Sequence, residues 1–256
     1  MSHSVDLRHI LETWPYDPDN ETRLVRGDDG RQVLQVRTPL GIEQYELDGR
    51  PDGIRPHGKE SVLHFHLDRL ERSRRSGTED SFELTSQDCG ELFDEGMLYY
   101  FRYIRLFQLH DWRRTLRDTA RNLRVFDLVQ HYAQREEDRQ FLEKWRPYIL
   151  RINASAAAMQ QLERNAFDKG LDIINKAVEK IEGLEEVDDE TFAFERDRSL
   201  STLRVLASQI QKSRPVSEME KLETQLQRAI ETQEFERAAK LRDRIRDLKN
   251  HQAQTP

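Results

Sequence analysis

Residues 219–249, MEKLETQLQRAIETQEFERAAKLRDRIRDLK, carry the clearest pattern in this chain. Apolar residues recur there at helical spacing on both sides of a polar break at Thr232 to Glu234. The apolar positions are Leu222, Leu226, Ala229 and Ile230 before the break, and Ala238, Leu241, Ile245 and Leu248 after it. The pattern predicts two short helices folded back on each other.

The residues at the break suit a tight helical hairpin. We expect the ring of Phe235 to fill the corner, while Ala238 and Ala239 let the two backbones approach closely. Charged residues make up 15 of the 31 positions, so the polar faces are well solvated. The apolar stripe needs another surface to cover it. Two interpretations stay open: a docking or dimerising hairpin, and an amphipathic tail packed on its own domain.

The order aromatic-Glu-x-Ala-Ala-x-Leu-Arg-Asp runs from Phe235 to Asp243. It closely resembles the UVR motif shared by the UvrB and UvrC excision-repair subunits, and similar motifs occur in Clp-type chaperone ATPases and their adaptors. The resemblance implies a helical hairpin that binds a partner protein or its own copy and carries no catalytic residue. We therefore expect partner contact through residues of this module, namely Leu226, Phe235, Ala238, Ala239, Leu241, Arg242, Asp243, Ile245 and Leu248.

The resemblance covers about an eighth of the chain, and the rest resembles no other part of those repair proteins. There are no helicase motifs, no nuclease domain, and no Gly-rich phosphate loop ending in Gly-Lys-Ser/Thr. Recognition of a short module does not transfer the pathway in which that module is best known.

Composition sets further bounds. The chain of 256 residues has no apolar run of the ~20 residues that a membrane span needs, and its N-terminus lacks the features of a signal peptide. We expect a cytoplasmic protein with no membrane partner. The single cysteine, Cys89, excludes an internal disulfide and a cysteine-based zinc site. The net charge of -7 argues against attraction of the whole surface to DNA, but permits a local basic strip.

The N-terminal part reads as a small β-rich unit over residues 1–80. Short apolar or alternating runs between Thr22 and Leu47 are separated by Asp28-Asp29-Gly30 and Pro39-Leu40-Gly41, which predicts a three-stranded antiparallel meander. A segment from Glu60 to Arg74, with its leucines on one helical face, could supply a helix that covers this sheet. A helical turn is also possible from Val5 to Leu11.

Residues 86–212 read as almost continuous helix, interrupted by short corners. We expect helices near residues 91–109, 112–133, 138–162, 166–181 and 189–212, with Ser86 as the first N-cap and a kink or break at Pro147. Aromatic residues mark the corners at Trp112 and Phe167, and the helical pairs resemble divergent tetratricopeptide-type repeats. The two corners are 55 residues apart, against 34 in that family, so an irregular helical bundle stays the alternative.

The predicted fold class is thus mainly α with a small β-rich N-terminal unit (α+β). It comprises residues 1–80, a tetratricopeptide-like helical array over residues 86–212, and a UVR-type hairpin over residues 218–250.

The most metal-like cluster is His64-x-His66, with His57 before it and Asp68 after it. On a strand, His64, His66 and Asp68 would share a face and could hold zinc or iron. On a helix, His64 and Asp68 become an i, i+4 pair and His66 turns away. The helix is the simpler interpretation, so we expect no metal site and no cofactor.

A basic stripe is predicted on the second long helix, where Arg113, Arg117, Arg121 and Arg124 fall within an arc of about 80°. This stripe could neutralise phosphates or bind an acidic peptide. Alternatively, it is a solvated face paired with carboxylates such as Glu91, Asp94 or Glu95 on the preceding helix.

No Ser-His-Asp order or nucleophile elbow is present, and Cys89 has no local basic partner. Our first hypothesis is therefore a non-enzymatic adaptor or scaffold of bacterial type. The alternative is a nucleic-acid-associated factor recruited to DNA repair complexes, with the arginine stripe bound to phosphate. A third possibility, an enzyme around His57, His64 and His66, would require a bound metal.

Overall fold

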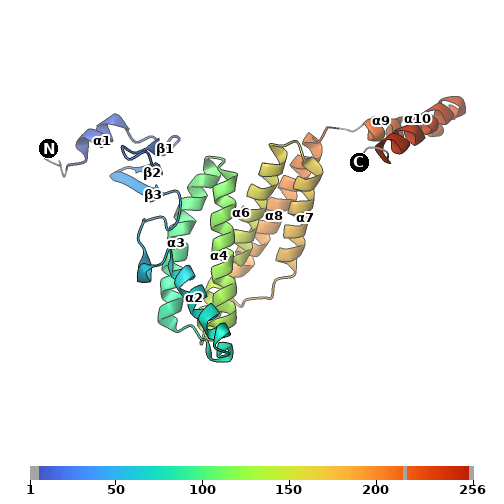
Figure 1. Cartoon of the computed structure of the whole chain (residues 1–256). Helices are drawn as coiled ribbons and strands as arrows, with labels where there is room; N and C mark the ends of the chain where they lie inside the picture. Colours follow the sequence, from blue (N-terminus) through green and yellow to red (C-terminus); the bar gives the residue numbers. More distant parts are fainter. Residues whose placement is uncertain (1–5, 216–217, 254–256) are drawn as a thin grey trace. The chain divides into compact units, whose positions relative to one another are not determined.

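The computed structural model describes residues 6–215 and 218–253 and is mostly helical, with one small antiparallel sheet near the N-terminus (Figure 1). The chain divides into two compact units, of which the first extends to Ile210 and the second begins at Gln211. The predicted fold class, mainly α with a small β-rich N-terminal unit, is confirmed. No helix in the described part of the chain combines the length and the apolar character that crossing a membrane requires.

The sheet is the predicted three-stranded meander, with β2 in the centre. Leu34 of β2 lies opposite Leu24 of β1 on one side and Tyr45 of β3 on the other. Leu34 is fully buried and packs in one cluster with Leu47 and with Leu106 of a following helix. The three strands are β1 Thr22–Arg26, β2 Gln32–Thr38 and β3 Gly41–Glu46.

A short helix, α1 (Arg8–Thr13), precedes the sheet and overlaps the predicted turn; Val5, where that prediction began, lies outside the described residues. After the sheet, the 3₁₀ turn η1 (Pro56–Gly58) leads into α2 (Val62–Arg75), and η2 (Glu79–Ser81) follows α2.

Helix α2 confirms the predicted helix but not its expected role as the cover of the sheet. Its buried residues Val62, Leu63 and Leu70 share a core with residues of the next two helices, such as Leu92 and Val129. The sheet is covered instead by Leu106. Periodicity identifies the buried face of a helix but does not say which neighbour lies against it.

Six helices follow, and Figure 1 shows α3, α4, α6 and α7 side by side. Helices α3 and α4, α4 and α6, and α6 and α7 pack against each other in pairs. Apolar residues of α6, α7 and α8 form a second core around Leu150, Ile174 and Leu203. The bounds are α3 Ser86–Gln108, α4 Trp112–Tyr132, α5 Glu136–Glu143, α6 Arg146–Leu162, α7 Phe167–Glu182 and α8 Glu190–Ser213. The tetratricopeptide-like character of this region stays a prediction.

Helix α3 begins one residue away from the predicted cap. Thr85, not Ser86, is the N-cap: its hydroxyl accepts a hydrogen bond from the Asp88 amide at 3.2 Å, and the Asp88 carboxylate accepts one from the Thr85 amide at 2.9 Å. This reciprocal pair is a capping box. It fixes the boundary because Asp88 stands three residues after Thr85. Pro147 breaks the helix predicted over residues 138–162, since it stands in the first turn of α6.

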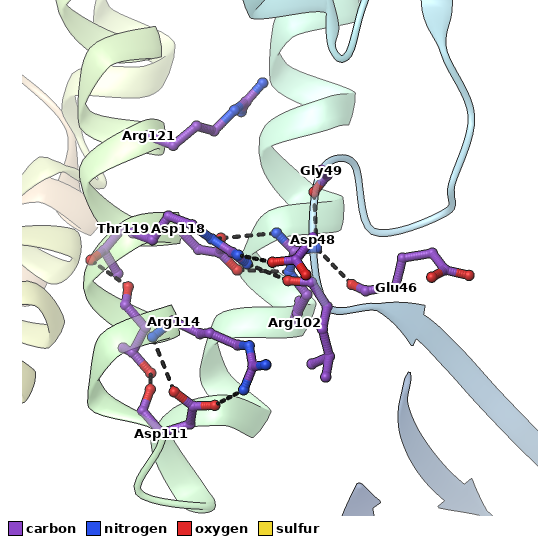
Figure 2. Close-up of polar contacts among 12 residues, drawn as sticks. Glu46, Asp48, Gly49, Arg102, Asp111, Arg114, Asp118, Thr119 and Arg121 are labelled. Atoms are coloured by element: carbon purple, nitrogen blue, oxygen red, sulfur yellow. Dashed lines mark hydrogen bonds and ion pairs between the residues drawn. The ribbon is translucent and has the colours of Figure 1, made fainter. Parts of the chain in front are cut away.

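A buried polar network fastens the end of the sheet to the helices (Figure 2). Arg102 of α3 donates to both carboxylate oxygens of Asp118 of α4, at 2.7 and 2.8 Å. Its remaining nitrogen, Nη1, donates to the carbonyl oxygens of Glu46 and Gly49, at 2.7 and 2.9 Å. One guanidinium therefore satisfies backbone acceptors at the end of β3 and just after it, and holds α3 to α4.

The corners before α4, α7 and the last helix share one backbone geometry. A residue with positive φ stands two positions before the aromatic residue in each: His110 (59°), Asn165 (57°) and Gln233 (59°). The next amide then reaches back five residues to a carbonyl oxygen, at 2.9, 2.9 and 2.8 Å respectively. This is the Schellman arrangement that ends a helix. The aromatic residues Trp112, Phe167 and Phe235 thus start new helices at equivalent positions.

Candidate interaction site

The C-terminal unit contains the predicted hairpin, formed by α9 (Glu218–Glu231) and α10 (Phe235–Ala253). The two helices pack closely along their length. Four buried residues form the seam between the two helices. Leu222 and Ala229 stand seven residues apart on α9, and Ala238 and Ile245 stand seven residues apart on α10. Such spacing keeps side chains on one helical face. The apolar pattern in the sequence therefore predicted the inner face of the hairpin.

The expected role of Phe235 in filling the corner is wrong. Its side chain is 67% exposed, and Ile230 at the end of α9 is 49% exposed. Of the two alanines, Ala238 lies in the seam, whereas Ala239 is exposed. The Schellman turn at Gln233 closes the corner through the backbone, so no aromatic wedge is needed.

The nine predicted contact residues separate into inner and outer sets. Asp243 lies on the outside, where it pairs with Arg246 at 3.4 Å, an exposed pair that contributes little to stability. The inner set is buried or half-buried and holds the hairpin together: Leu226, Ala238, Leu241, Ile245 and Leu248. The outer set is exposed and available to another molecule: Phe235, Ala239, Arg242 and Asp243.

This unit is a two-helix module with its own buried seam. Its sequence matches the family model described as "UvrB/uvrC motif" over residues 217–250, so the chain carries a UVR motif at its C-terminal end. Comparisons with curated proteins and with solved structures found no match to this chain.

The predicted arginine stripe does not form a continuous cationic surface. Arg117 donates to the Leu47 carbonyl oxygen at 2.5 Å and pairs with Asp48 at 2.8 Å and with Asp118 at 2.9 Å. Arg121 contacts the buried Glu95 carboxylate and lies apart from the Arg102 network (Figure 2). Burial, together with neighbouring arginines, lowers the pKa of Arg121.

Arg113 and Arg124 are exposed and have no ion-pair partner among the described residues. They stand roughly 16 Å apart along α4 at 1.5 Å per residue. Of the three carboxylates considered as partners, Glu95 is the one that meets the stripe, while Glu91 lies 3.3 Å from His57.

The histidine cluster lies around a helix, so the strand arrangement that would bring His64, His66 and Asp68 to one face is wrong. His66 is fully buried and points away from the exposed His64. Asp68 pairs with Lys59 at 2.6 Å rather than with His64. No group of three potential metal-binding side chains gathers anywhere in residues 6–215 and 218–253.

Cys89 is buried in the core of α2, α3 and α4. Burial raises the pKa of its thiol to about 11, which keeps it protonated and unreactive at neutral pH. The sequence predicted Glu95 as a partner of the arginine stripe but not its contact with α2, where its buried carboxylate accepts hydrogen bonds from the amides of Val62 and Leu63 at 2.7 and 3.2 Å. It thereby stabilises the N-terminus of α2. Its distance in sequence from α2 left no local signal.

Proposed function

We propose that this chain is a non-enzymatic adaptor or scaffold of the cytoplasm, in which the UVR hairpin provides the contact to a partner protein or to a second copy. The proposal assigns no catalytic role and no cofactor to the chain. It rests on the matched motif, on the hairpin lying in a compact unit of its own, and on the exposure of the Phe235 ring.

The observation that carries the proposal is a difference among the three equivalent corners. Trp112 is 5% exposed; its ring packs on Phe107 and its indole nitrogen donates to Glu163 at 2.6 Å. Phe167 is half-buried against the second core. Phe235 occupies the same backbone position but is 67% exposed. An aromatic ring on a small two-helix unit is the kind of anchor that a protein partner covers.

The charge of the module favours contact between copies. Residues 218–250 contain eight acidic and eight basic residues, although the whole chain has a net charge of -7. Two hairpins therefore carry no net repulsion, and opposite charges on the two can pair at the rim. This supports self-association as the first form of contact to test.

The experiment compares Phe235→Ala with Arg237→Ala, which changes a neighbouring exposed side chain on the same helix. We expect Phe235→Ala to abolish association, with the helical circular dichroism signal retained because the buried seam is untouched. Arg237→Ala should have little effect, because its ion pair with Glu234 is exposed. Association that survives Phe235→Ala would contradict the proposal.

The alternative of a nucleic-acid-associated factor needs a different test. Substituting Arg117 or Arg121 would break internal ion pairs, so the informative double variant is Arg113→Glu with Arg124→Glu. A salt-sensitive DNA mobility shift that this variant removes would support the alternative. A chain that shifts no DNA at low salt would eliminate it.

A further inference from the structure

A cavity of about 510 Å³ lies among α3, α4, α5, α6 and α8. Its size falls within the range of small-molecule sites, and its walls are mostly apolar. Aromatic side chains from three helices form much of the lining: Phe93 and Tyr100 of α3, Phe141 of α5, and Trp145 and Tyr148 around the start of α6. The rings of Phe93 and Phe141 meet edge to face, with centroids 4.7 Å apart. Flat ring faces and edges of this kind accept a planar aromatic compound.

One acidic side chain in the wall is only partly paired. Glu195 of α8 lines the cavity and is 6% exposed. Its Oε1 lies 3.6 Å from a guanidinium nitrogen of Arg198. Its Oε2 is buried and has no hydrogen-bond partner. A buried carboxylate oxygen without a donor is unfavourable, so a turn of this carboxylate toward a donor brought by a ligand into the cavity would be stabilising.

The charges around the cavity indicate what kind of donor fits. Arg198 and Lys144 also line it, and Lys144 pairs with Asp189 at 3.4 Å. Glu195 thus already has a cation beside one oxygen. A ligand cation would meet repulsion from Arg198, and a ligand anion would meet repulsion from Glu195. An uncharged N–H or O–H group bonds to the carboxylate of Glu195 without either cost.

We propose that this cavity binds a planar aromatic small molecule that carries an uncharged N–H or O–H donor, and that this donor bonds to the carboxylate of Glu195. The site belongs to the larger unit and is independent of the hairpin. It gives the chain a ligand-binding activity beyond association with another protein.

The proposal is tested with N-phenyl-1-naphthylamine, an uncharged fluorescent compound whose emission rises in apolar surroundings, and with its N-methyl derivative, which lacks the N–H donor. Both are titrated into the full chain. We expect saturable binding of the first compound, with affinity about tenfold higher than that of the second, because a hydrogen bond to a charged group is lost on methylation. Equal affinities, or no saturable signal for either compound, would overturn the proposal.

Two variants locate the site. Glu195→Met removes the acceptor but keeps a side chain of similar length. It should reduce the ratio of the two affinities, N–H compound to N-methyl derivative, to near one. Gly96→Leu should fill the cavity and abolish binding of both compounds; a Cβ at Gly96 meets nothing nearer than the Asn122 side chain at 3.9 Å, so the helix accepts it.

Leu40→Ala removes an apolar side chain that is 93% exposed; it is the control for dye binding at exposed apolar surface and should leave both affinities unchanged. Urea unfolding confirms that each variant is folded. Binding retained by Gly96→Leu, or an N–H preference retained by Glu195→Met, would contradict the assignment.

Discussion

Arg102 and Asp118 form a two-bonded ion pair in which neither side chain is exposed to solvent. The same guanidinium also donates to the carbonyl oxygens of Glu46 and Gly49. The pair therefore joins α3, α4 and the segment that leaves the sheet. This makes it one of the contacts through which the β-rich part and the helical part depend on each other.

Arg102→Met should lower the free energy of unfolding of the larger unit by about 3 to 5 kcal/mol, because it leaves two carbonyl oxygens without this donor and the buried Asp118 carboxylate with Arg117 alone. Arg102→Lys should also be destabilising, since an ammonium cannot reproduce the forked contacts. Urea unfolding measures both. Arg75→Met, which removes an exposed i, i+4 pair with Glu71, is the control and should change little. A similar small effect at Arg102 would show that the network is not structural.

The stability of the larger unit should fall as the pH drops from 7.5 to 5.5 because of His66. Burial lowers the pKa of this ring below its ordinary value of 6.5, against the partial opposition of Asp88. Its Nδ1 accepts from Arg69 at 2.9 Å, which requires the neutral ring. In the unfolded chain the His66 ring takes up a proton near pH 6.5, whereas in the folded chain it takes one up only at lower pH. The stability that the neutral ring contributes is therefore fully present above pH 6.5 and is lost as the pH falls below it.

His66→Met removes this titration and should flatten the pH dependence measured by urea unfolding. His64→Gln, a change at an exposed histidine of the same helix, should keep it. The same fall in stability in His66→Met as in the parent chain would assign the effect to another group.

Two glycines should respond to alanine in opposite directions. Gly90 lies on the exposed side of α3, and a Cβ there meets nothing within 4 Å. Gly90→Ala should raise the free energy of unfolding by about 1 kcal/mol, since glycine is unfavourable within a helix. Gly49 has a φ of +64°, so Gly49→Ala should lower it by about 1 to 2 kcal/mol. Thermal unfolding of both variants measures the direction of each change. A change in the same direction for both would contradict the different roles assigned to the two glycines.

Ile245→Asp should unfold the hairpin while leaving the larger unit intact. Ile245 is one of the four seam residues, and an unpaired charge placed there is not tolerated by so small a core. Hydrogen exchange should become fast in residues 218–253 and stay unchanged in α3 and α4. Ala239→Asp, at the exposed neighbour of the seam, is the control and should keep the hairpin folded. Faster exchange across α3 and α4 would show that the two units unfold together.

The sequence predicted the elements of the fold because their patterns are local. Alternation between Thr22 and Leu47 predicted the meander, and helical spacing predicted α3, α4 and the seam of the hairpin. The break at Pro147 was predicted from a local property as well, because proline removes a helical donor and restricts the preceding residue.

The sequence did not predict contacts between distant segments. Glu95 binds the start of α2, and Arg102 binds carbonyl oxygens after β3, through pairings that no spacing rule covers. Helical spacing placed Arg121 on the same face of the helix as Arg113, although the Arg121 side chain turns inward to Glu95. At the hairpin corner, the aromatic pattern predicted a wedge at Phe235, but the backbone turn closed the corner unaided.

The cavity escaped prediction for the same reason. Its walls come from five helices, and Tyr100 and Tyr148 read in sequence as ordinary apolar positions. The orphaned oxygen of Glu195 could be found only once the neighbours of α8 were placed.

The central claim is that the hairpin mediates association, and light scattering on the full chain and on a chain ending at Arg214 tests it most directly. We predict that the full chain is a dimer and that the shortened chain is a monomer with its remaining helices intact by circular dichroism. A full chain that is monomeric at high micromolar concentration would contradict self-association. A shortened chain that remains dimeric would contradict the role of the hairpin altogether.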